Sequence, residues 1–198
     1  MTRHLSKCSR LQTLAPPGKQ SPTPAFHLVV EGRWATVYWM HVAVPVKAPL
    51  SRLDDFLRAI WLECCGHMSA FIIDGIRYSC SPMEEEGERG RGTPLSRVLD
   101  VGTKFFYEYD FGSTTELELK VVGFWNQSKA KGAVQLLARN DPPQIFCDRC
   151  KTQPATQICT ECEGTWLCES CAAAHECGEE MRLPVANSPR VGVCAYTG

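Results

Sequence analysis

Residues 147–177, which read CDRCKTQPATQICTECEGTWLCESCAAAHEC, hold seven of the chain's 12 cysteines. Six of them form three C-x-x-C pairs, and such a pair can turn tightly enough to place two sulfurs one tetrahedral edge apart. Eight donors in this stretch fit two closed four-ligand sites. The predicted ligands are Cys147, Cys150, Cys159, Cys162, Cys168, Cys171, His175 and Cys177. We therefore expect a small module that binds two Zn²⁺ ions.

The short gaps between the pairs favour an interleaved arrangement over two successive sites. The first and third pairs then share one ion, while the second pair, His175 and a final donor share the other. Cys177 is favoured as that donor because a single residue separates it from His175, and Cys194 remains the alternative. Sites with four protein ligands leave no position for a reacting water, so the zinc is expected to be structural. It would supply folding energy that so short and polar a segment lacks.

Cysteine usage also bears on the compartment. The N-terminus has no apolar segment of the kind found in secretory signals, and no run is apolar enough to span a membrane. Clustered C-x-x-C pairs without an export signal indicate metal binding under reducing conditions rather than disulfides or a redox dithiol. We expect a cytoplasmic protein that does not contact membranes.

Composition divides the chain into three parts. Residues 1–25 are rich in proline, lack apolar periodicity and are expected to be a disordered tail. Residues 26–140 are expected to form the main domain, and Asp141-Pro142-Pro143 marks its end. Residues 144–198 then comprise the zinc module and a C-terminal segment. Cys8 in the tail is expected to be unpaired.

Upstream of the module the sequence predicts an α+β domain: a mainly antiparallel sheet with one principal helix packed on it. Residues 27–31 and 35–44 are typical of strands, and His41 in the second is expected to be a core histidine. Ser51-Arg52-Leu53-Asp54 is similar to a capping box at the start of the helix. Gly66 is expected to stop it. The apolar stripe of this helix is Leu53, Phe56, Leu57, Ile60, Trp61 and Cys64, and both Cys64 and Cys65 are placed on the helix.

Two hairpins are predicted to follow the helix. Asp74-Gly75 lies between apolar runs and favours a type I′ turn. Residues 81–93 are charged and glycine-rich, as in an exposed loop, and 94–101 could form a short helix. The second hairpin joins 104–110 to 115–125, and 133–138 is a candidate last strand.

Two stretches of the main domain resemble the plasmid pRiA4b ORF-3-like family. They are Leu53–Ile60 continuing through Gly66-His67-Met68-Ser69-Ala70-Phe71 to Tyr78, and Phe106–Leu117 with its run Tyr109-Asp110-Phe111-Gly112. Many members follow that glycine with an acid, an aromatic residue and a histidine, whereas this chain has Ser113-Thr114-Thr115-Glu116. The resemblance implies a fold, but no settled biochemical activity. The module itself resembles the B-box and other cross-brace zinc fingers, which mainly serve protein association.

Three functions follow as hypotheses. The first is a zinc-containing binding or adaptor protein that contacts a protein partner, because acidic residues outnumber basic ones from Cys147 onward. The second is a nucleic-acid-binding accessory protein that uses Arg3, Lys7, Arg10 and Lys19. A net charge of −1 does not favour it. The third is an enzyme of unknown reaction that uses His67, Asp110 and Glu116, although no known catalytic motif accompanies them.

Overall fold

A computed structural model describes residues 23–127, 133–162 and 164–198. The expected tail up to residue 22 lies outside the described residues, as does Cys8. The first strand begins at Thr23, within the last three residues of the expected tail 1–25. No helix among the described residues is long and apolar enough to cross a membrane.

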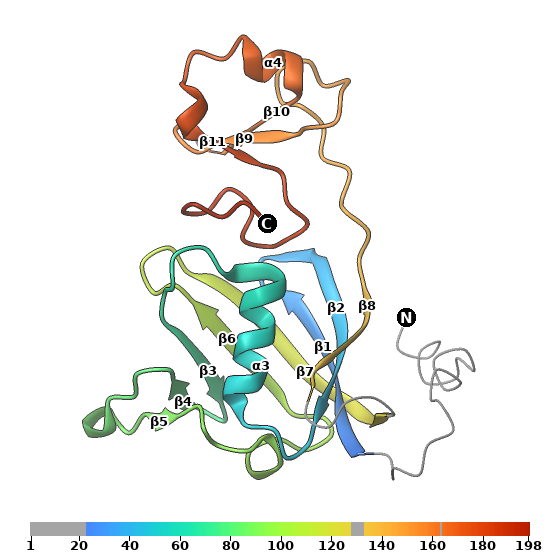
Figure 1. Cartoon of the computed structure of the whole chain (residues 1–198), viewed down its shortest axis with the longest axis vertical. Coiled ribbons are helices and arrows are strands. Elements are labelled where there is room, and N and C mark those ends of the chain that lie inside the picture. The colour runs from blue at the N-terminus through green and yellow to red at the C-terminus, as the bar shows by residue number, and fades with distance from the viewer. Residues whose placement is uncertain (1–22, 128–132, 163) are drawn as a thin grey trace.

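The main domain is built on one sheet of eight strands in the order β5-β4-β3-β6-β7-β1-β2-β8. Every neighbouring pair is antiparallel except β4 and β5. The strands are β1 (Thr23–Gly32), β2 (Ala35–Pro45), β3 (Ser69–Ile73), β4 (Ile76–Ser79), β5 (Arg89–Gly90), β6 (Lys104–Tyr109), β7 (Thr115–Gln127) and β8 (Gln135–Arg139). The helix α3 (Leu50–Leu57) lies across one face of this sheet (Figure 1). The predicted α+β class is confirmed.

The helix carries the predicted apolar stripe. Leu53, Leu57 and Trp61 are fully buried in the core, while Phe56 and Ile60 pack against its edge. After Leu57 the chain continues as a π-helical turn, Arg58–Leu62, and leaves the helix there. Cys64 and Cys65 therefore lie beyond the helix and not on it. Gly66 has a positive φ of 74°, but it follows the end of the helix by several residues.

The predicted capping box is wrong. The N-cap is Pro49, and no side chain caps the helix. The carboxylate of Asp54 is buried and accepts hydrogen bonds from the hydroxyls of Ser69 (2.6 Å) and Tyr107 (2.7 Å), and it also pairs with Arg91. A buried acid with these three donors ties the helix to β3, β6 and the loop before the 3₁₀ turn Leu95–Arg97. Asp54, which the sequence pattern places in a cap, instead makes a contact in the core.

Both hairpins have the predicted form. Asp74 and Gly75 have φ values of 49° and 77°, as a type I′ turn requires. Alternate residues of β6 and β7 face the core, where Phe105, Tyr107, Leu117 and Leu119 are fully buried. The loop between the hairpins is largely exposed and includes the 3₁₀ turn Glu84–Glu86.

His41 is buried, as expected of a core histidine. Its Nδ1 lies 3.0 Å from Nε2 of His27 on the neighbouring strand. Burial, and then the nearby His27, lower the pKa of His41 to about 4. The imidazole is therefore neutral in the folded protein at physiological pH.

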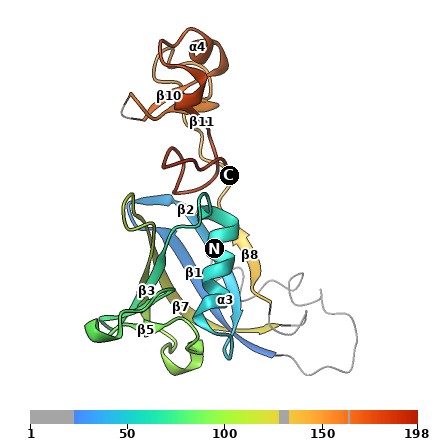
Figure 2. The ribbon, with the colours of Figure 1, turned by 60° about the vertical axis from the view of Figure 1, so that its left-hand side comes forward.

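The C-terminal module is a separate small unit above the sheet (Figures 1 and 2). Its three-stranded sheet has the order β10-β9-β11. Its elements are β9 (Gln157–Cys159), β10 (Thr165–Leu167), α4 (Glu169–Ala173), the 3₁₀ turn Glu179–Met181 and β11 (Arg182–Pro184). Residues 185–198 then return toward the main domain, so the expected unit 144–198 consists of two parts in space.

The C-terminal segment, residues 185–198, lies between the module and the main domain (Figure 1). Ser188 donates a hydrogen bond to the carbonyl of Trp61 (2.6 Å), and Arg190 is fully buried against the main domain. On the other side Gly192, at a φ of 77°, lies so close to Ile158 of β9 that a Cβ there would stand 2.7 Å from Cδ1 of Ile158. The segment thus contacts both units.

Candidate metal centres

The predicted donors come from turns, from the end of one strand and from the short helix of the module. Cys147 and Cys150 form a turn in which the amide of Lys151 (φ 59°) donates to the carbonyl of Cys147 at 2.9 Å. Cys159 ends β9, and Cys162 lies in the turn that leads to β10. Cys168 is the N-cap of α4, and Cys171 lies within that helix. The three pairs are therefore carried by a turn, by the end of β9 with the turn after it, and by the start of α4.

The first cluster joins the first and third pairs, as the interleaved prediction requires. The ligand atoms of Cys147, Cys150, Cys168 and Cys171 all lie within 4.8 Å of one another. The sulfurs of Cys150 and Cys168 are 3.8 Å apart. That separation is the edge of a tetrahedron with zinc–sulfur bonds of about 2.3 Å.

The second cluster joins the second pair to His175 and Cys177. The sulfur of Cys162 lies 3.6 Å from Nε2 of His175 and 3.5 Å from the sulfur of Cys177. The sulfur of Cys177, and not that of Cys194, thus lies with the other three donors of this cluster. Nδ1 of His175 is buried with no hydrogen-bond partner among the described residues, and Nε2 is the nitrogen turned toward the sulfurs.

The thiols of the two clusters differ in pKa. Hydrogen bonds from Thr152 and from the Gln153 amide lower the pKa of Cys150 to about 6. Burial raises the pKa of Cys159, yet hydrogen bonds with His175 and nearby amides outweigh it and lower that pKa to about 7. Sharing hydrogen bonds with neighbouring thiols raises the pKa of Cys171 and of Cys177 to about 12. One divalent cation per cluster would stabilise all of these thiolates at once.

The donor sets, four thiols in one cluster and three thiols with one imidazole in the other, are those of structural zinc sites. The module also has little else to hold it together. Its own buried apolar cluster contains Cys159, Leu167 and Ala172; the first is itself a donor, and the other two are next to donors in the sequence. The residues present therefore fit a bound metal ion in each cluster, and that ion would supply the stability that the core lacks.

The three residues considered for catalysis do not form one site. His67 Nδ1 lies 3.6 Å from the Asp110 carboxylate, but Glu116 is paired with Arg33 at 2.6 Å. As expected, Asp110 accepts hydrogen bonds from backbone amides of its turn, those of Gly112 (3.1 Å) and Ser113. It also binds Arg190 (2.7 Å), which lowers the pKa of its carboxyl. A carboxylate so occupied has little capacity to act as a base.

A third group of donors was not predicted. Cys64, Cys65 and His67 meet Cys194, with all four ligand atoms within 4.8 Å of one another. Core packing was the expected role of Cys64, and Cys194 was considered only for the module. The single hint in the sequence is the dense run Cys64-Cys65-Gly66-His67. Cys194, the fourth donor, is 127 residues from His67, and residue spacing does not predict contacts at that separation.

Known proteins resemble the main domain. No curated protein matches significantly. The crystal structure of a protein of unknown function from Methanosarcina mazei Go1 is similar, with a TM-score of 0.51 and 15% sequence identity over 59% of this chain and 68% of that chain. This likeness shows the fold alone. The family model described as plasmid pRiA4b ORF-3-like protein matches residues 31–145, close to the expected 26–140. With more than half of its length matched, the chain belongs to the plasmid pRiA4b ORF-3-like protein family.

Proposed function

We propose that this chain is a zinc-containing binding protein that contacts a protein partner through the C-terminal module. Two closed four-donor clusters support a structural metal ion in each, because no coordination position is left for a substrate. The module is also set apart from the main domain, which leaves most of its surface accessible (Figure 2). Metal would then maintain a recognition surface rather than perform a reaction.

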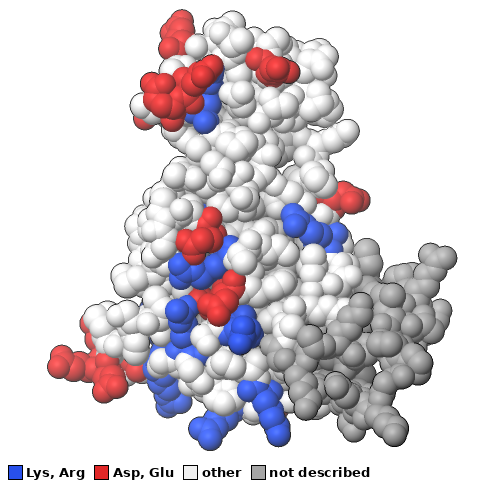
Figure 3. Space-filling view, in the orientation of Figure 1, with Lys and Arg blue, Asp and Glu red and all other residues white. Residues whose placement is uncertain are grey.

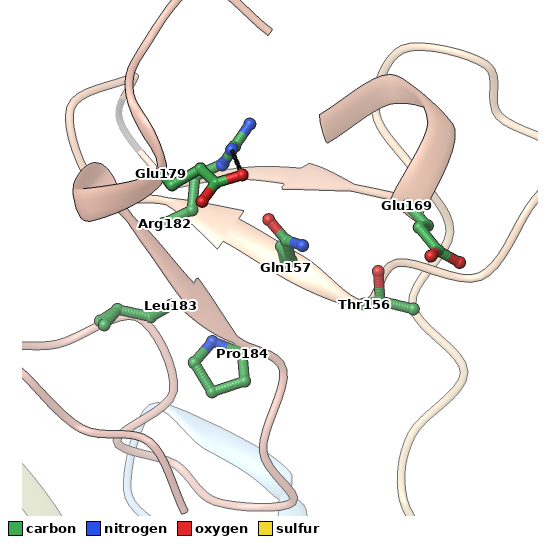
Figure 4. A pocket seen from close by; sticks show the side chains of 7 residues that line it. All are labelled: Thr156, Gln157, Glu169, Glu179, Arg182, Leu183 and Pro184. Atoms are coloured by element: carbon green, nitrogen blue, oxygen red, sulfur yellow. Dashed lines mark ion pairs between the residues drawn. The ribbon is translucent and has the colours of Figure 1, made fainter. Parts of the chain in front are cut away.

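The observation that carries the proposal is an acidic groove on the module. It has a volume of about 510 Å³ and is lined by Thr156, Gln157, Glu169, Glu179, Arg182, Leu183 and Pro184. Glu169 and Glu179 lie at its opposite ends with Gln157 between them (Figure 4). Strand β11 forms one edge of the small sheet along this groove. A sheet edge beside a groove can accept an extended peptide segment.

Charge indicates the chemistry of that segment. Glu179 forms an ion pair with Arg182 at 3.7 Å, but the side chain of Glu179 is 95% exposed, whereas that of Arg182 is 9% exposed and also donates to the carbonyl of Ala172. The accessible charge of the groove is therefore negative, and acidic side chains also lie elsewhere on the module (Figure 3). The occupant that fits is a partner segment that carries lysine or arginine.

The alternatives have less support. The nucleic-acid hypothesis depends on basic residues up to Lys19, all of them outside the described residues. An acidic module repels a polyanion. The enzyme hypothesis loses Asp110 as a free base, because Arg190 binds its carboxylate. A cytoplasmic location remains our expectation; the described cysteines are all free of disulfides, as a reducing compartment would keep them.

The test begins with capture of partners from native cells by the full, metal-loaded chain, followed by titration of each purified candidate. Glu169→Gln combined with Glu179→Gln should weaken binding by about tenfold and reduce its salt dependence, since two exposed charge contacts are lost. The matched control is Glu84→Gln with Glu85→Gln, two exposed acids of the main domain. The proposal is wrong if the control variant weakens binding and the groove variant does not, or if only nucleic acid is captured.

A further inference from the structure

The third donor group lies where the C-terminal segment meets the main domain. Cys64 and Cys65 follow the helical segment, His67 precedes β3, and Cys194 comes from the C-terminal segment. The sulfurs of Cys65 and Cys194 are 3.7 Å apart, and Nε2 of His67 is 3.4 Å from the sulfur of Cys194. Three thiols and one imidazole thus converge from segments far apart in the sequence.

These distances match those of a tetrahedral metal site. Zinc bonds of about 2.3 Å to sulfur and 2.0–2.1 Å to nitrogen give edges of roughly 3.8 Å between sulfurs and roughly 3.6 Å between sulfur and nitrogen. The module clusters have the same edges, 3.8 Å between Cys150 and Cys168 and 3.6 Å between Cys162 and His175. A disulfide would need its sulfurs about 2.05 Å apart.

The residues behind the third group form a supporting shell. The imidazole of His67 presents Nε2 to Cys194 and Nδ1 to the carboxylate of Asp110, at 3.6 Å. A carboxylate behind the second nitrogen of a histidine is the common way to orient a metal ligand. Arg190 binds Asp110 at 2.7 Å and also reaches the sulfur of Cys64 at 3.4 Å. The positive charge of Arg190 offsets the negative charge that remains when three thiolates surround one divalent ion.

We propose that Cys64, Cys65, His67 and Cys194 bind a third zinc ion that fastens the C-terminal segment to the main domain. This explains why Arg190 is fully buried next to a thiol and an acid. It also assigns one role, coordination of the same ion, to the adjacent Cys64 and Cys65 and to Cys194, whose backbone is left-handed (φ 55°). Since the same segment packs on Ile158, the ion also helps to hold the module in place.

This site differs from the module sites in its access to solvent. Cys65 and Cys194 are exposed, while Cys147, Cys159 and Cys168 in the module clusters are buried. A competing chelator therefore reaches the third ion most easily. We expect it to leave first, before either module ion. The inference does not depend on a protein partner, because it concerns only contacts within this chain.

Metal analysis of the full chain tests the inference. Protein purified under reducing conditions with zinc should hold three ions, and Cys194→Ser and His67→Gln should each hold two. Cys80→Ser is the matched control, since Cys80 is a free cysteine outside all three groups, and it should hold three. Cys177→Ser should also lose one ion, and the double variant with Cys194→Ser should lose two, which separates the sites. Two ions in both the wild type and Cys194→Ser would overturn the proposal.

Two further measurements separate metal binding from its rivals. Zinc should slow alkylation of Cys194 at least tenfold in the wild type, and much less in His67→Gln. Rapid alkylation unaffected by zinc, or a Cys65–Cys194 disulfide in the metal-loaded protein, would contradict the proposal. Hydrogen exchange of residues 185–198 should accelerate in Cys194→Ser while the module stays protected. Unchanged protection of that segment would show that the ion does not fasten it.

Discussion

The main domain and the C-terminal module bury apolar side chains on very different scales. Among the described residues, the core of the main domain contains 24 buried hydrophobic residues, from the strands, the helical segment and the stretches that carry Ala48, Leu95 and Leu99. The corresponding cluster of the module contains three, one of which, Cys159, is itself a predicted metal donor. Burial alone can stabilise the first, because each large apolar side chain contributes about 1.5–3 kcal/mol. The module has eight metal donors instead, so the two units should respond to different perturbations.

Metal removal should have the largest effect. Bound zinc contributes on the order of 10 kcal/mol to the folding of small modules, so chelation should unfold residues 144–184 and leave the sheet intact. Hydrogen exchange should show full loss of protection in the module and little change in β6 and β7. If a verified metal-free protein keeps the module protected, the contrast between the two units is wrong.

A substitution in the core should destabilise the main domain and leave the module folded. Trp61 is fully buried, and Trp61→Ala should destabilise the main domain by roughly 3–5 kcal/mol while the two module clusters keep their metal. Nε1 of Trp61 has no hydrogen-bond partner among the described residues, so Trp61→Phe is a suitable control and should cost less than half as much. Denaturant unfolding measures both. A loss below about 1 kcal/mol for the alanine variant would mean that the helix face contributes little.

Mild acid should lower the stability of the main domain by a smaller amount, through the buried His41. The folded protein keeps His41 neutral down to a pKa of about 4, whereas a free histidine titrates near 6.5. The unfolded chain therefore binds more protons in this range, and the stability contributed by His41 is present above pH 6.5 and lost as pH falls toward 4. His41→Gln should flatten the decline in melting temperature between pH 7.5 and 5.5. Identical slopes in the two proteins would exclude this source of acid sensitivity.

Removal of residues 1–22 should have the smallest effect. The sequence before Thr23 holds almost no periodic apolar surface that could add to either unit. Thermal unfolding of the shortened chain should agree with that of the full chain within error. A drop of several degrees would show that this segment contributes to one of the two units.

The sequence by itself determined the features that depend on residues close to one another along the chain. The alternating apolar residues of β6 and β7, the Asp74-Gly75 turn and the stripe through Trp61 follow from local geometry, and each appears in the structure as predicted. The grouping of the module donors was also predictable, because all eight lie within 31 residues and only a few pairings fit so short a chain.

Tertiary structure decided what depends on residues that are distant in the sequence. Asp54 resembles a capping acid, but Tyr107 and Ser69 reach it from strands that the sequence does not connect to it. Cys194 could be assigned to the module by counting donors, yet the C-terminal segment carries it to His67 on the main domain. Loop closure costs little more for a long loop than for a short one, so spacing cannot select among distant partners. Only the packed fold, through the buried contact of Arg190 with Asp110, determines where that segment lies.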